Sequence, residues 1–89
     1  MKAVITVTGI DKIGIIANVS SILADSSVNI EDISQTTTQG YFMMYMLVDI
    51  SDMSVSFGEL SQKLSDRGGR MGLEIRIQKD EIFKAMHSV

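Results

Sequence analysis

The sequence predicts an α+β protein with the βαββαβ order of the ferredoxin-like fold. Two stretches with helical spacing of apolar residues each follow a stretch with strand character, and two strand-like stretches follow one another in the middle of the chain. Because βαβ crossovers are right-handed, both helices should cover one face of a four-stranded antiparallel sheet. The 89 residues fit one small domain. We place this domain at 1–79, followed by a helical extension at 80–89.

The first strand and the first helix are predicted within residues 2–25. Alternation puts Ala3, Ile5 and Val7 on one face of a strand over residues 2–8. Asp11 is expected to be the N-cap of a helix over residues 12–25. The apolar stripe of this helix consists of Ile15, Ile16, Val19, Ile22 and Leu23.

The middle of the chain is predicted to form two consecutive strands. In residues 26–39 the apolar alternation slips in phase, which predicts a β-bulge near Glu31 or Asp32. A Gln-Gly pair at 39–40 predicts the turn. Residues 41–50 are apolar on both alternating faces, as is typical of a central strand that is covered at least partly on each side.

A second helix and a last strand complete the predicted domain. Ser56 with Glu59 has the spacing of a capping box at the helix start. Gly68-Gly69 is expected to end this helix, because glycine suits the left-handed position after a helix. Residues 73–78 alternate cleanly between apolar and polar side chains, which predicts a half-buried strand.

One face of the predicted sheet is left without helices. Tyr41, Met43, Tyr45 and Leu47 would project from it. Soluble monomers rarely expose apolar surface of this extent, so we expect the C-terminal helix, a partner chain or both to cover it. The apolar side of that short helix consists of Ile82, Phe83 and Met86.

The junction between the first strand and the first helix is a candidate ligand site. The first N–H groups of a helix have no intrahelical partner and carry partial positive charge. A carboxylate could dock on them, and Gly14 leaves room for its approach. Asp11 or Asn29 could engage an ammonium group. The alternative is that Asp11 only caps the helix and Gly14 only lets the helix pack on the strand, and the residues alone leave both open.

The stretch VTGIDKIGIIANVSSILADSSVNIEDIS resembles the opening half of an ACT domain. That family is a regulatory module of βαββαβ fold, often fused to enzymes of amino-acid metabolism. The resemblance rests on Asp11 and the Ile13-Gly14 turn, the apolar helix, and Asn29-Ile30 at the second strand. The chain is most similar to stand-alone ACT proteins of the glycine-cleavage-repressor group. Ile13 is a departure, since many amino-acid-binding members have proline there.

The resemblance implies a non-catalytic regulatory domain. It would form a homodimer by side-by-side pairing of edge strands and bind a small ligand, an amino acid, to modulate a regulated protein. The ligand would lie at the dimer interface, between this loop of one chain and the second strand of the next. The candidate ligand-binding residues are Asp11, Lys12, Ile13, Gly14, Ile15, Asn29 and Ile30. The alternative function is a ligand-free module for dimerisation and protein interaction.

The composition of the chain argues against several other functions. The chain has no cysteine, and no Ser/His/Asp constellation, phosphate loop or metal-ligand spacing, so we expect no catalytic residue, metal or cofactor. Residues 39–48 resemble the aromatic third strand of RNA-recognition domains, but the first strand has no aromatic residue. With a net charge of −3, we expect no nucleic-acid partner. No apolar run is long enough to span a bilayer and no signal peptide is evident, so we expect a cytoplasmic protein.

Three other groups of residues have ordinary structural explanations. The methionines of residues 41–50 fit core positions better than an adaptable binding surface. Glu31 and Asp32 should point to opposite faces of a strand, which favours a solvated edge over a cation site. His87, the single histidine, is expected to be exposed.

Overall fold

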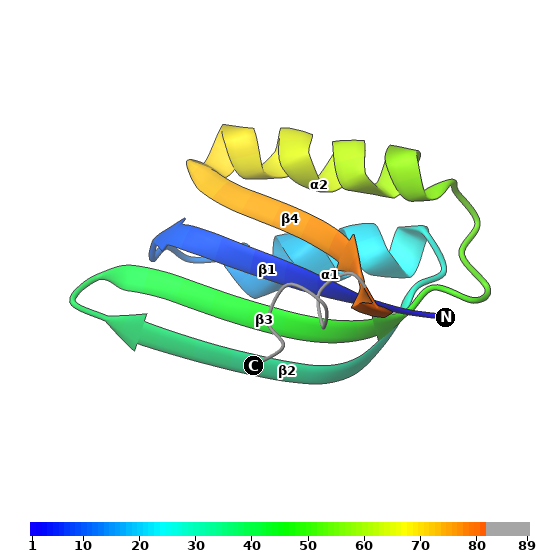
Figure 1. Ribbon diagram of the computed structural model, residues 1–89. Helices are drawn as coiled ribbons and strands as arrows, with labels where there is room; N and C mark the ends of the chain where they lie inside the picture. Colours follow the sequence, from blue (N-terminus) through cyan, green and yellow to red (C-terminus); the bar gives the residue numbers. More distant parts are fainter. Residues whose placement is uncertain (82–89) are drawn as a thin grey trace.

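The computed structural model describes residues 1–81 and confirms the predicted α+β architecture. The elements are β1 (Lys2–Ile10), α1 (Ile15–Asp25), β2 (Asn29–Thr38), β3 (Tyr41–Asp49), α2 (Phe57–Met71) and β4 (Leu73–Lys79). The four strands form one antiparallel sheet in the order β2-β3-β1-β4, so β2 and β4 are its edges. Figure 1 shows both helices on the same face of this sheet.

The core lies between the helices and the sheet, because alternate residues of the central strands face the helices. In β1 and β3, Ile5 is paired with Met46 and Val7 with Met44, and all four are buried. The buried helix residues are Ile15, Val19, Ile22 and Leu23 in α1 and Leu60, Leu64 and Gly68 in α2. Ile16, which the sequence pattern placed in the same stripe, is 37% exposed, because it faces a hollow beside the edge strand β2.

The hairpin of β2 and β3 has the predicted turn and the predicted bulge. Gln39 and Gly40 have φ values of 52° and 82°, and two positive φ values in a row are the requirement of a type I′ turn. The register shifts between Ile30 and Asp32, which leaves Glu31 as the bulged residue. The bulge restores the phase of the strand, so that the same face looks toward the helices on both sides of it.

The start of α1 differs from the prediction. The helix begins at Ile15, and its N-cap is Gly14, with φ 92° and no side-chain cap. The backbone N–H of Asp11 instead donates to the Gly40 carbonyl at 2.8 Å. The predicted capping role of Asp11 is therefore wrong. The first strand runs on to Ile10, so Asp11 is held at the hairpin turn, three residues before the cap position.

The end of α2 also differs from the prediction. The helix does not stop at Gly68-Gly69 but continues to Met71, and the left-handed cap is Gly72 with φ 69°. The N–H of Gly72 lies against the carbonyls of Gly68 and Gly69. A Cβ at Gly68 would lie 2.9 Å from the Leu73 carbonyl oxygen, which is closer than real Cβ contacts come. Gly68 therefore allows close packing of α2 on β4, and Gly72 is the C-terminal cap of the helix.

The helix-free face of the sheet is apolar along β3. Tyr41, Met43 and Tyr45 are 61%, 58% and 38% exposed, and Leu47 is half-buried. The apolar positions of the predicted C-terminal helix and His87 lie outside the described residues. In the described part of the chain, neither helix is long and apolar enough to cross a membrane.

Candidate functional site

The loop between β1 and α1 presents a carboxylate and an uncapped helix end. The Asp11 side chain is exposed and makes no hydrogen bond or ion pair in the part of the chain that the structure describes. Because Gly14 has no side chain, the first N–H groups of α1, on Ile15 and Ile16, have no side-chain acceptor. A negative group and an N–H cluster with partial positive charge therefore lie within one short loop.

Lys12 and Ile13 of the same loop have different surroundings. A Cβ at Gly72 would lie 3.6 Å from Lys12 Nζ, which puts this ammonium beside the C-cap of α2. That helix end carries partial negative charge and favours a cation. Ile13 is fully exposed, so its side chain makes no contribution to the core. Lys12 thus lies near the end of α2, while Ile13 faces outward.

A hollow of about 410 Å³, which we call the loop hollow, lies between this loop, the first turn of α1 and β2. Its lining residues are Asp11, Lys12, Gly14, Ile15, Ile16, Ala17, Gln35, Thr37 and Phe42. Gln35 and Thr37 were not among the predicted site residues. They lie on the helix side of β2, where they pair with the buried Met44 and Phe42. They could have been identified as polar residues at the alternating positions of the strand that face the helices.

A second hollow, of about 560 Å³, lies along the rest of α1. Its lining residues are Ala17, Ser20, Ser21, Ala24, Val28, Asn29 and Ile30. Ala17 lines both hollows, so they lie next to each other along α1, and together we call them the α1–β2 groove. Asp11, Lys12, Gly14 and Ile15 line one end of the groove, and Asn29 and Ile30 line the other. Within one chain the two sets do not meet, because the 11 residues of α1, about 16 Å long, separate them.

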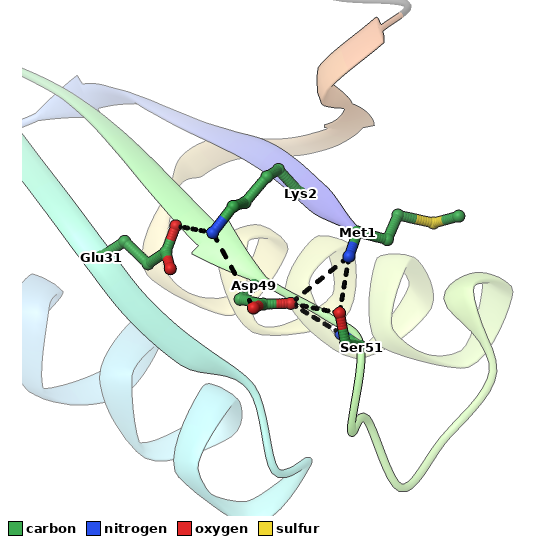
Figure 2. A network of polar contacts seen from close by, with 5 residues as sticks. All are labelled: Met1, Lys2, Glu31, Asp49 and Ser51. Carbon is green, nitrogen blue, oxygen red and sulfur yellow. Dashed lines mark hydrogen bonds and ion pairs between the residues drawn. The ribbon is translucent and has the colours of Figure 1, made fainter.

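The Asn29 end of the groove is anchored by a network of charged groups, which Figure 2 shows. Asn29 pairs with Asp49 in the sheet. Asp49 Oδ1 accepts hydrogen bonds from the Ser51 backbone N–H at 2.9 Å and from the Ser51 hydroxyl at 2.7 Å. Lys2 Nζ lies 3.8 Å from the other Asp49 oxygen and donates to the Glu31 carboxylate. The network thus ties the bulge of β2 to β1 across the intervening strand.

These contacts shift two pKa values. The hydrogen bonds from Ser51 hold the pKa of the Asp49 carboxyl at about 2, and the nearby Met1 ammonium, 3.6 Å away, acts in the same direction. The hydrogen bond to Glu31 raises the pKa of the Lys2 ammonium. Both shifts favour the charged forms at neutral pH. Neither group is tuned toward neutrality, as a general acid or base would be, so the network has a structural role.

The adjacent carboxylates of the bulge do not act together. Glu31 accepts the hydrogen bond from Lys2, whereas the Asp32 carboxylate accepts the backbone N–H of Ile33 at 2.9 Å. Across residues 1–81, no three His, Asp or Glu side chains converge where they could hold a metal ion.

The family model of the ACT domain matches residues 2–78. This chain belongs to the ACT domain family. The match spans β1 through to β4, so the loop, the groove and both edge strands are all part of the ACT domain.

Relatives of this ACT domain have the same length and the same fold. A UPF0237 protein of Clostridium acetobutylicum is 53% identical over 89 residues, and the alignment covers 100% of both chains. An ACT domain protein from Streptococcus pneumoniae has a TM-score of 0.81 at 43% identity, with 94% of each chain covered.

Two less similar solved structures with this fold are named as regulatory proteins. The regulatory subunit of aspartate kinase from Thermus thermophilus has a TM-score of 0.67 at 25% identity over 89% of this chain and 51% of its own. A glycine cleavage repressor-like protein has a TM-score of 0.77 at 23% identity over 88% of this chain and 44% of its own, which shows the shared fold.

Proposed function

We propose that this ACT domain is a non-catalytic regulatory domain that binds an amino acid in the loop hollow at a dimer interface. The observation that carries the proposal is that the Asp11 carboxylate, which has no partner among residues 1–81, lines the same hollow as the uncapped start of α1. An amino acid bears both complementary charges. Its carboxylate would accept from the N–H groups of Ile15 and Ile16, and its ammonium would pair with Asp11.

The rest of the loop hollow supports a ligand that is polar at one end and apolar at the other. Gln35 and Thr37 of β2 supply hydrogen-bonding groups that no other residue of the described chain occupies. Ile16 and Phe42 supply apolar surface for a ligand side chain. Small-ligand sites likewise combine apolar surface with a few placed polar groups that orient the ligand.

A second copy of the chain would complete the site. β2 is an edge of 10 residues that are exposed or half-exposed throughout, and its outer N–H and C=O groups have no partner strand within residues 1–81. Two-fold antiparallel pairing of β2 with the partner's β2 sets the Thr37 end of one strand against the Asn29 end of the other. The loop of one chain then approaches the partner's Asn29 and Ile30. This pairing reunites the two sets of predicted residues that lie apart within one chain.

Regulation would follow from a difference in ligand affinity between two states of the dimer. A ligand that bridges the two chains stabilises the paired state, and a regulated protein that contacts only one of the states responds to ligand concentration. This linkage requires no catalytic group in the domain.

Thermal unfolding with a panel of the common amino acids at millimolar concentration tests the proposal. A ligand at 100 times its dissociation constant adds about 2.7 kcal/mol of stability, which is a shift of roughly 10 °C or more in a domain of this size. We expect one or two amino acids to give such a shift, Asp11→Asn to abolish it, and the exposed-loop control Asp52→Asn to retain it. A panel in which no amino acid shifts the midpoint would refute the amino-acid proposal.

The helix-free face of the sheet favours a second candidate function, a ligand-free interaction module. Tyr41 and Met43 are more than half exposed there, and Ile13 is fully exposed at the loop. Exposed apolar patches of this kind mark protein–protein contacts. A flat amino-acid panel, with the homodimer intact, would favour this function over the first.

A further inference from the structure

A chain of hydrogen bonds behind the loop connects α2 to Gly14. Arg67 Nη1 donates to Asn18 Oδ1 at 2.6 Å, and Asn18 Nδ2 donates to the Gly14 carbonyl at 2.8 Å. Both side chains are half-buried. We propose that Asn18 and Arg67 are positioning residues that aim the Ile15 N–H into the loop hollow, a role that rests on the ligand site proposed above.

The Gly14 carbonyl is held by two hydrogen bonds from one residue. It accepts the backbone N–H of Asn18 at 2.9 Å and the side-chain amide of Asn18 at 2.8 Å. The Gly14 carbonyl and the Ile15 N–H belong to one planar peptide unit, in which they point in opposite directions. Holding the carbonyl therefore fixes the direction of the Ile15 N–H, which has no intrahelical partner and lies at the loop hollow.

Arg67 determines which way the Asn18 side chain is turned. A carboxamide donates through its nitrogen and accepts through its oxygen, whereas a guanidinium only donates. Arg67 must therefore face Oδ1, which leaves Nδ2 for the Gly14 carbonyl. The reversed orientation would set donor against donor at Arg67 and oxygen against oxygen at Gly14. The positive charge of Arg67 strengthens its bond and so reinforces the productive orientation.

The connection is particular to Arg67 among the basic residues on this side of α2. Lys63 and Arg70 line the same crevice between α1 and α2, of about 290 Å³, together with Asp25 and Asp66. In the described part of the chain, neither Lys63 nor Arg70 makes a hydrogen bond to α1. Arg70 is therefore a matched control, with the same charge and the same crevice but no link to the loop.

Backbone ¹⁵N order parameters of residues 12–15, measured without ligand, test the positioning role. We expect values of about 0.85 in the wild type and in Arg70→Ala, and below about 0.6 in Arg67→Ala and Asn18→Asp. Asn18→Asp is the sharpest variant, because its carboxylate keeps the contact with Arg67 but offers no donor to Gly14. A rigid loop in both Arg67→Ala and Asn18→Asp would overturn the proposal.

Two further measurements separate this role from a loss of folding and from the proposed function. Arg67→Lys, which keeps a charged donor for Asn18, should restore the order of the loop. An amino acid that stabilises the wild type should bind about tenfold more weakly to Asn18→Asp, because the hydrogen bond that orients the Gly14 carbonyl is lost. Its affinity for Arg70→Ala should be unchanged. Undiminished affinity in Asn18→Asp would overturn the positioning role. If no amino acid stabilises the wild type, the proposed function fails while the order parameters still decide the positioning role.

Discussion

At the scale of the residue, Asp49 gives the domain a defined response to acid. Its pKa is about 2 in the folded protein, because Ser51 donates two hydrogen bonds to the carboxylate, and about 3.9 in an unfolded chain. The unfolded state therefore takes up the proton first as the pH falls. This contribution to stability is complete above about pH 4 and is lost as the pH falls toward about 2. We expect Asp49→Asn to unfold with a shallower dependence on pH in this window than the wild type.

Urea denaturation at half-unit steps between pH 2 and pH 5 measures this difference. The exposed Asp52, which follows Ser51 by one residue, supplies the control, and Asp52→Asn should keep the slope of the wild type. Identical slopes in Asp49→Asn and the wild type would show that the network of Figure 2 does not favour the charged carboxylate in solution.

Asp11 shows how far a single residue could be interpreted from the sequence. Its acid character and its place before a helix were visible, and its carboxylate makes no hydrogen bond or ion pair within residues 1–81. The predicted capping role is wrong because an N-cap residue must stand directly before the first residue of the helix. β1 extends to Ile10 and the hairpin turn holds the Asp11 N–H, so the cap position moves to Gly14. Such a shift arises from a contact with Gly40, which is distant in sequence.

At the scale of the element, the neighbouring glycines of α2 are expected to behave in opposite ways. Gly68→Ala would place a methyl group 2.9 Å from the Leu73 carbonyl and 3.0 Å from Ile75 Cγ1, so we expect a loss of about 1–3 kcal/mol in the free energy of unfolding. A Cβ at Gly69 meets nothing within 4 Å, so Gly69→Ala should gain about 0.5–1 kcal/mol from helix propensity. Chemical denaturation of the two variants checks the signs. Equal effects at both positions would contradict the close packing of α2 on β4.

The elements were predictable where a local pattern determines them. Ser56 was identified as a cap from its spacing to Glu59, and its Oγ accepts the Glu59 N–H at 3.1 Å. The Gln39-Gly40 turn and the bulge at Glu31 were likewise visible, because turn chemistry and strand phase are local. Gly68 and Gly69 were misread as a stop, since a glycine that permits close packing looks the same in a sequence as one that ends a helix.

At the scale of the whole molecule, the proposed dimer makes a prediction about the middle of β2. Ile33 is 42% exposed and near the centre of Asn29–Thr38, so the two-fold axis of an antiparallel β2 pair would bring it close to the partner's Ile33. Ile33→Lys would set two ammonium groups against each other and should convert the dimer to a monomer. Glu74→Lys puts the same side chain on the other edge, β4, and should leave the dimer intact. Sedimentation equilibrium of both variants distinguishes pairing through β2 from pairing through β4.

The sequence by itself determined the order of the elements, the composition of the core and the family resemblance, because apolar periodicity and turn residues act over short distances along the chain. Only the tertiary structure placed Gln35 and Thr37 beside the loop, set the two hollows next to each other at Ala17 and connected Arg67 to Gly14 through Asn18. These contacts link residues on different elements. Strand order, register and the packing of helices on the sheet decide them, and no local pattern records them.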